Sequence, residues 1–151
     1  SKTPTARLVI AGSGEEESKL KKIARELQID RHVDFKGKVS DDEKLYLLQS
    51  SWMLVNPSMM EGWGITTIEA NACGTPIIAS DVPGLRDSIR SPHTGFLVPY
   101  GDWRAFAARI ETIIQNEKLR EAMSSNATEW ASGFDWRRGS KNFLSVIKGE
   151  M

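Results

Sequence analysis

The fold class of this chain is decided by residues 54–80, which read LVNPSMMEGWGITTIEANACGTPIIAS. A short apolar run is halted by Asn56-Pro57-Ser58, and a second apolar run, Pro76-Ile77-Ile78-Ala79, comes shortly after Gly74. Between the two runs, the turn around Gly62 and Gly64 opens a short helical pattern for which Gly74 is the expected C-terminal glycine. The stretch therefore predicts a strand, a glycine-rich turn, a helix and a second strand.

The same alternation extends outward in both directions. The first apolar run begins at Trp52, so its strand is predicted at 52–55. Further strands are predicted at residues 7–11, 32–35 and 95–98, and helical segments near 20–27, 40–48, 85–89, 102–114, 117–131 and 137–147. Strands that alternate with helices indicate an α/β fold, a Rossmann-like three-layer domain with a mostly parallel sheet covered on both faces. We expect one domain over residues 1–151, with ligands bound at the carboxyl ends of the strands.

Local signals sharpen some of these elements. Ser40 with Glu43 is typical of a capping box, and Asp102 is the expected N-cap of the helix that follows it. Four aromatic residues are predicted to be core or anchoring side chains, namely Trp103, Trp130, Phe134 and Trp136.

Composition excludes several classes of function. The 151 residues are 40% apolar and 26% charged, and 20 Lys+Arg balance 20 Asp+Glu, so the basic face that nucleic-acid binding needs is not expected. No apolar run is long enough to span a bilayer, and the first residues do not resemble a signal peptide. Cys73 is the only cysteine, which favours the cytoplasm, with room for peripheral association of the intact enzyme with a membrane. His32 and His93 lack the spacing of metal ligands.

The candidate site lies in Glu61-Gly62-Trp63-Gly64-Ile65-Thr66-Thr67-Ile68-Glu69. The first N–H groups of the helix after Gly64 lack partners within the helix and suit a phosphate. A carboxylate on each side, from Glu61 and Glu69, suits hydroxyl groups at both ends of a phosphate-containing ligand such as a nucleotide diphosphate sugar. Two glutamates at this spacing also occur by chance, so from the residues alone both interpretations stay open.

A dinucleotide fingerprint at Gly12-Ser13-Gly14 is the competing hypothesis. Its third glycine position holds Glu17, and the three consecutive acids that end there would repel a pyrophosphate. A tight turn whose acids complement the helix dipole is the better interpretation. Lys36, Lys38 and Lys44 indicate a solvated basic edge, or a segment whose backbone meets a base.

Five segments together resemble the C-terminal domain of family 4 retaining glycosyltransferases, which have the GT-B fold. They are LVIAGSGEE, VDFKGKVSDDE, the stretch from Leu54 to Gly84, TGFLVPYGD and FDW, and the resemblance runs from about Arg7 to Ile147. The resemblance implies a domain that binds a nucleotide sugar donor and works without a metal or other cofactor.

The resemblance also implies roles for individual residues. Glu69 would hold the ribose hydroxyls, and Glu61, the catalytic residue, would contact the hydroxyls of the transferred sugar. Contacts with the diphosphate or sugar would come from the turn at Gly62 and the backbone at Gly64, Ile65 and Thr66. The base would be bordered by Lys38, Val39, Asp41 and Lys44. The implied reaction transfers a hexose to an acceptor hydroxyl with retention of configuration.

The chain departs from the family pattern in one respect. Family members place an Arg and a Lys, which neutralise the leaving diphosphate, in a strand–helix unit ahead of the segment that matches this chain. We therefore expect a fragment of a larger enzyme that lacks this unit and the acceptor-binding N-terminal domain. It should transfer nothing alone and should have an unpaired sheet edge prone to self-association. A non-catalytic nucleotide-binding or interaction module is the alternative.

Overall fold

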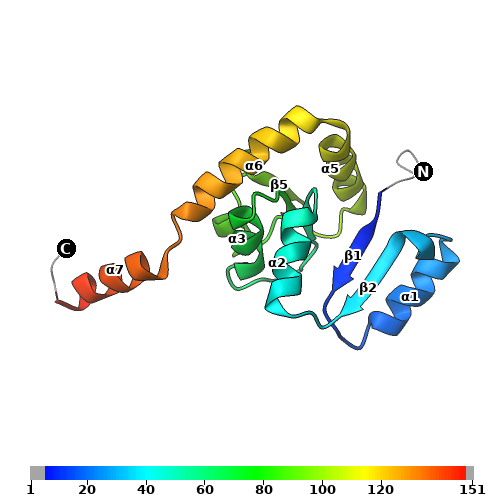
Figure 1. The fold of residues 1–151 in the computed structure, drawn as a ribbon, viewed down its shortest axis with the longest axis horizontal. Coiled ribbons are helices and arrows are strands. Elements are labelled where there is room, and N and C mark those ends of the chain that lie inside the picture. Colours follow the sequence, from blue (N-terminus) through cyan, green and yellow to red (C-terminus); the bar gives the residue numbers. More distant parts are fainter. Residues whose placement is uncertain (1–5, 149–151) are drawn as a thin grey trace. The chain divides into compact units, whose positions relative to one another are not determined.

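The computed structural model describes residues 6–148, the side chains of residues 136, 138 and 142 excepted. The chain divides into two compact units, Ser1–Tyr46 and Leu47–Met151 (Figure 1). The boundary falls within helix α2 (Asp41–Ser50). The two units are described separately, and one domain over residues 1–151 stays a prediction.

The first unit contains two parallel strands and a helix. Strand β1 (Leu8–Ala11) pairs with β2 (Val33–Gly37), so that Leu8 lies opposite Val33 and Ile10 opposite Phe35. Helix α1 (Glu17–Glu26) and the short 3₁₀ helix η1 (Asp30–His32) form the crossover connection that a parallel pair requires. The Nζ atom of Lys21, on α1, lies 5.5 Å from the centre of the Phe35 ring.

The second unit contains a three-stranded parallel sheet. Strands β3 (Leu54–Asn56), β4 (Ile77–Ser80) and β5 (Gly95–Val98) are hydrogen-bonded in the order β3-β4-β5. All four residues of the central strand β4 are buried, as expected for a parallel strand covered on both faces. The predicted α/β class and parallel pairing are confirmed, with the described strands in two groups.

The two faces of β4 belong to two different apolar clusters, because successive side chains of a strand point to opposite faces. Ile77 and Ala79 pack with Leu48, Ala70, Val82, Leu85 and Ile89, which come from α2, α3 (Ile65–Ala72) and the segment around α4 (Leu85–Ser88). Ile78 packs with Phe96, Val98, Phe106, Ile113 and Met123, which come from β5, α5 (Trp103–Gln115) and α6 (Glu117–Ser132). The second unit therefore has three layers, with helices on both faces of its sheet.

Helix ends follow the predicted signals in several places. The carboxylate of Asp102 accepts a hydrogen bond from the amide of Ala105 (2.9 Å), and Ser40 Oγ accepts one from the amide of Glu43 (3.2 Å). Gly74, just after α3, has the left-handed φ of 74° that favours glycine. Asn116 caps α6, which sequence inspection did not single out.

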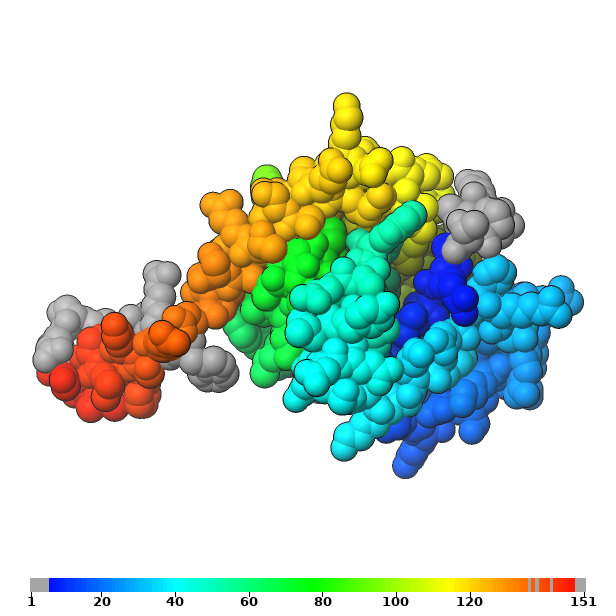
Figure 2. Space-filling view, in the orientation of Figure 1, coloured from blue at the N-terminus to red at the C-terminus, as the bar shows by residue number. Residues whose placement is uncertain are grey.

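The helices of the second unit pack on one another as well as on the sheet. Helix α3 lies along α6, and Figure 2 shows their surfaces in contact. The last helix, α7 (Trp136–Lys148), carries several exposed apolar residues, among them Phe143, Leu144 and Ile147.

One aromatic prediction is wrong. Trp103 is 66% exposed, because it begins α5 on the solvent side, where the guanidinium of Arg104 lies 4.5 Å from its ring centre. Trp130 and Phe134 do make packing contacts, which are described below, and the side chain of Trp136 lies outside the described residues. None of the helices within residues 6–148 is both long and apolar enough to cross a membrane.

Candidate functional site

The candidate site is built on the loop of residues 57–64 that joins β3 to α3, called here the β3–α3 loop. It begins where the side-chain oxygen of Asn56 accepts a hydrogen bond from the amide of Ser58 (3.1 Å), which ends the strand. It ends at Gly64, the N-cap residue of α3, whose φ of 79° and ψ of 53° are left-handed. A residue with a Cβ adopts this conformation only at a cost, so glycine is required where the chain enters α3.

The amino terminus of α3 is open to solvent. The carbonyl oxygen of Gly64 accepts hydrogen bonds from the amides of Thr67 (2.9 Å) and Ile68 (3.3 Å). The amides of Ile65 and Thr66 belong to the first turn, where helix geometry provides no partner, and both residues are exposed. This end of the helix can therefore receive an anion.

The two predicted carboxylates lie on either side of this helix start along the chain. Glu61 is in the β3–α3 loop and Glu69 is in the second turn of α3, and both are half-buried. Glu69 also affects Cys73, one turn further along. Partial burial and, to a lesser extent, the negative charge of Glu69 raise the pKa of the Cys73 thiol.

The segment around α4 packs against the β3–α3 loop. The sequence predicted the helical turn near 85–89 but not this contact. A Cβ added at Gly84 would collide with the carbonyl oxygen of Glu61 and would lie 2.7 Å from that of Gly62. A Cβ added at Gly64 would lie 2.9 Å from Leu85 Cδ2 and 3.0 Å from Ser88 Oγ. The pair Pro83-Gly84 is a turn signal in the sequence, but only the fold shows which backbone it meets.

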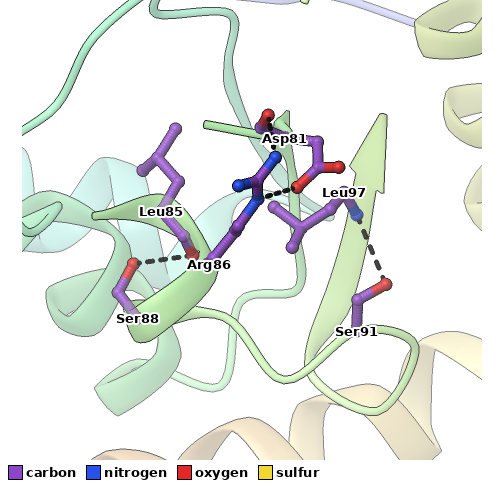
Figure 3. Close-up of polar contacts among 6 residues, drawn as sticks. All are labelled: Asp81, Leu85, Arg86, Ser88, Ser91 and Leu97. Atoms are coloured by element: carbon purple, nitrogen blue, oxygen red, sulfur yellow. Dashed lines mark hydrogen bonds and ion pairs between the residues drawn. The ribbon is translucent and has the colours of Figure 1, made fainter. Parts of the chain in front are cut away.

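Arg86 pairs with Asp81, which precedes it by five residues. Its Nε donates to Asp81 Oδ1 (2.6 Å) and its Nη2 donates to the carbonyl oxygen of Asp81 (3.1 Å), as Figure 3 shows. This hydrogen-bonded pair raises the pKa of the Arg86 guanidinium above its usual value. The two hydrogen bonds between Arg86 and Asp81 close the turn between β4 and α4. Within α4, Ser88 Oγ lies 3.3 Å from the carbonyl oxygen of Leu85 (Figure 3).

The residues predicted to border a base belong to the first unit. Lys38 and Val39 follow β2, and Asp41 and Lys44 lie in the first turn of α2, where their charged groups are 3.4 Å apart. The amide of Gly12 donates to the carbonyl oxygen of Gly37 (2.7 Å), which ties the ends of β1 and β2 together. Whether one ligand contacts both this segment and the β3–α3 loop stays a prediction.

Comparison with known proteins provides an independent observation. The family model described as glycosyl transferases group 1 matches residues 1–130 of this chain. A phosphatidyl-myo-inositol mannosyltransferase of Mycobacterium leprae is 35% identical over 143 residues, which are 94% of this chain and 37% of that protein.

Two solved structures have the same fold. Sucrose-phosphate synthase from Thermosynechococcus elongatus superposes with a TM-score of 0.88 at 26% identity, over 98% of this chain and 39% of that one. A pneumococcal O-GlcNAc transferase, solved with UDP and GlcNAc, superposes with a TM-score of 0.85 at 27% identity, over 98% of this chain and 30% of that one. The chain thus spans well under half the length of each of these proteins.

Proposed function

Because this chain belongs to the glycosyl transferases group 1 family, we propose that it binds the nucleotide diphosphate sugar from which the intact enzyme transfers a sugar. The solved pneumococcal relative binds UDP, which supports a uridine nucleotide as the first donor to test. The predicted transfer of a hexose to an acceptor hydroxyl, with retention of configuration, forms part of the proposal.

The observation that carries the proposal is the exposed start of α3 between two half-buried carboxylates. The left-handed Gly64 leads the chain into the first turn of α3, where Ile65 and Thr66 are exposed and their amides have no partner within the helix. A diphosphate placed there would meet hydrogen-bond donors and the positive end of the helix dipole. These donors are part of the backbone, so they need no reorganisation as negative charge develops on the leaving phosphate.

The two carboxylates then take different parts of the ligand. Glu69, in the second turn of α3, accepts hydrogen bonds from the ribose hydroxyls, and Glu61 contacts hydroxyls of the sugar that is transferred. A carboxylate accepts strong hydrogen bonds from hydroxyl groups, so each pairing contributes to affinity and orientation. Nothing lies within 4 Å of a Cβ added at Gly62, so the sugar can approach the backbone there.

We propose that this transfer proceeds without a metal ion. The amides at the start of α3 would supply part of the positive potential that a divalent cation provides in other phosphoryl-group chemistry. Further neutralisation of the leaving diphosphate, and all contacts with the acceptor, are assigned to the remaining length of the intact enzyme. The support for that assignment is that this chain covers only 30–39% of the two solved structures described above.

The experiment that tests the proposal is titration calorimetry with UDP and with UDP and GDP sugars, on the wild type and on Glu69→Ala. Hydrogen bonds to a charged group are worth about 1.5–3 kcal/mol, so we expect affinity to fall about tenfold or more. Glu129→Ala, an exposed glutamate of α6, is the matched control and should bind like the wild type.

The outcomes separate the alternatives. Equal affinity of Glu69→Ala and the wild type would contradict the site assignment. Binding of UDP by the intact protein without transfer to any acceptor would instead indicate a non-catalytic nucleotide-binding module. Retention is tested on the product, because NMR spectroscopy reports whether the anomeric configuration of the donor is kept.

A further inference from the structure

A chain of aromatic contacts leads from the β3–α3 loop to the junction between α6 and α7. The ring of Trp63, in the loop, meets the ring of Phe134 edge to face, with centroids 5.0 Å apart and planes at 67°. Phe134 in turn meets Trp130 of α6 at 4.8 Å and 85°. Both distances lie in the range where edge-to-face pairs are favourable.

The far end of this aromatic chain is fixed by polar contacts. The indole Nε1 of Trp130 donates to the carbonyl oxygen of Ser88 (3.0 Å), and the guanidinium carbon of Arg90 lies 4.1 Å from the Trp130 ring centre. Trp130 therefore has a hydrogen bond in the ring plane and a cation over its face, which leaves it little freedom to rotate.

The contacts then return to the loop from which they started. The hydroxyl oxygens of Ser88 and Thr67 lie 2.8 Å apart. The hydroxyl oxygen of Thr67 also lies 2.5 Å from the carbonyl oxygen of Gly64. Ser88 and Thr67 are fully buried, so these hydrogen bonds are shielded from water. Trp63 and Gly64 are adjacent in the chain, and the contacts through Phe134, Trp130, Ser88 and Thr67 thus form a closed ring.

Phe134 contacts the loop through its ring, which meets Trp63, and it belongs to neither the sheet nor the helices that pack on it. It lies between the end of α6 at Ser132 and the start of α7 at Trp136. The other supports of the loop, such as Gly84 and Ser88, contact its backbone or lie within the core. Removing the Phe134 ring should therefore free Trp63 while leaving the layers of the second unit in place.

We propose that Phe134 is a positioning residue for donor binding, acting through Trp63 on the β3–α3 loop; this inference rests on the proposed function. The ring holds the loop in the conformation that presents Glu61 and the amides after Gly64. A loop that is ordered before the ligand arrives loses less conformational entropy on binding. Phe134 thus contributes to affinity for the nucleotide without touching it.

The test measures UDP affinity by titration calorimetry for the wild type, Phe134→Ala and Phe134→Tyr. An edge-to-face pair accounts for roughly a threefold to tenfold loss of affinity in Phe134→Ala. Phe134→Tyr keeps the aromatic ring, so its affinity for UDP should equal that of the wild type. Phe143→Ala is the matched control, because Phe143 is 67% exposed on α7, and it should bind UDP like the wild type.

A double-mutant cycle with Trp63→Leu tests the route. If Phe134 acts through Trp63, its removal should change UDP affinity much less when Trp63 is already replaced. Additive losses would overturn the inference, as would unchanged affinity in Phe134→Ala. If Phe134→Ala does not fold in a urea titration, Phe134→Leu replaces it in the same cycle. A wild type that binds no UDP would instead overturn the proposed function.

Discussion

Gly62 and Gly64 stand two residues apart in the β3–α3 loop, but the structure gives them different roles. Gly64 has a φ of 79° and is enclosed by Leu85, Thr67 and Ser88, whereas nothing lies within 4 Å of a Cβ added at Gly62. Only Gly64 is required by the backbone, whereas the open space at Gly62 is where we propose that the ligand approaches.

We therefore expect Gly64→Ala to lower the free energy of unfolding by about 1–3 kcal/mol, because alanine at this φ is strained and its Cβ meets three neighbours. Gly62→Ala should change the free energy of unfolding by less than about 0.5 kcal/mol. Urea denaturation of both variants measures the difference. Equal destabilisation would show that the loop conformation described here is wrong.

Cys73 reports on the position of Glu69. Burial and the negative charge of Glu69 raise the thiol pKa, so the reactive thiolate is scarce near neutral pH. Glu69→Gln removes the charge but not the burial, and the pKa should fall part of the way toward its ordinary value. Alkylation by iodoacetamide should then become faster at about pH 8, near the ordinary pKa of a thiol.

The pH profile of alkylation in the two proteins measures this shift directly. Glu129→Gln serves as the control because Glu129 lies on α6 and does not contribute to the raised pKa of Cys73. An unchanged profile in Glu69→Gln would show that the Glu69 carboxylate does not act on the Cys73 thiol.

At the scale of elements, most strands and helices were predictable from residue patterns. The expected strand at 52–55 is β3 (Leu54–Asn56), shifted because Trp52 lies outside the strand, where the guanidinium of Arg120 is 4.4 Å from its ring centre. The helices predicted at 117–131 and 137–147 are α6 and α7 within one residue at each end. Boundaries were clearest where a capping residue or glycine marks them, as at Asp102 and Gly74.

Edge strands allow a prediction about association. Within residues 6–148, β1 is hydrogen-bonded only to β2, and Leu8 and Val9 are 48% and 37% exposed. An exposed apolar edge favours pairing with another chain. We expect the 151-residue chain to show a sedimentation coefficient that rises with concentration, and Val9→Lys to reduce this rise.

The control for the edge is Ser18→Lys, which adds the same charge on an exposed position of α1. Sedimentation velocity over a range of concentrations compares the three proteins. Association that persists equally in Val9→Lys would exclude the β1 edge as its cause.

At the scale of the whole molecule, the activity expected of this chain depends on how much of each similar protein it matches. The chain spans 37% of the M. leprae mannosyltransferase, and the proposed function assigns acceptor contacts to a part of the enzyme outside these 151 residues. The 151-residue chain should therefore bind UDP weakly and transfer no sugar. Product formation from a UDP sugar measures this, and strong turnover by the chain alone would refute the assignment.

Independence from metal ions is a separate prediction for the intact enzyme. If backbone amides and cations of the intact enzyme neutralise the leaving diphosphate, the initial rate of transfer should be unchanged by EDTA. Added Mg²⁺ or Mn²⁺ should then have no effect on the rate. Loss of activity in EDTA that Mg²⁺ restores would contradict the metal-free proposal.

The sequence by itself determined the α/β class and the parallel strands, and it predicted where the candidate site lies. These depend on local patterns: apolar runs of strand length, glycines at turns, and two carboxylates around a helix start. The family resemblance rested on the same local segments. None of these inferences depends on contacts between residues that are far apart in the sequence.

Only the tertiary structure decided how the site is supported. It packed Gly84 and Ser88 against the β3–α3 loop, set Phe134 against Trp63, and paired Arg86 with Asp81. Each of these contacts joins residues that local periodicity does not relate. Such contacts arise when helices pack on both faces of the sheet, because close packing of those layers determines which side chains fill the space around the loop.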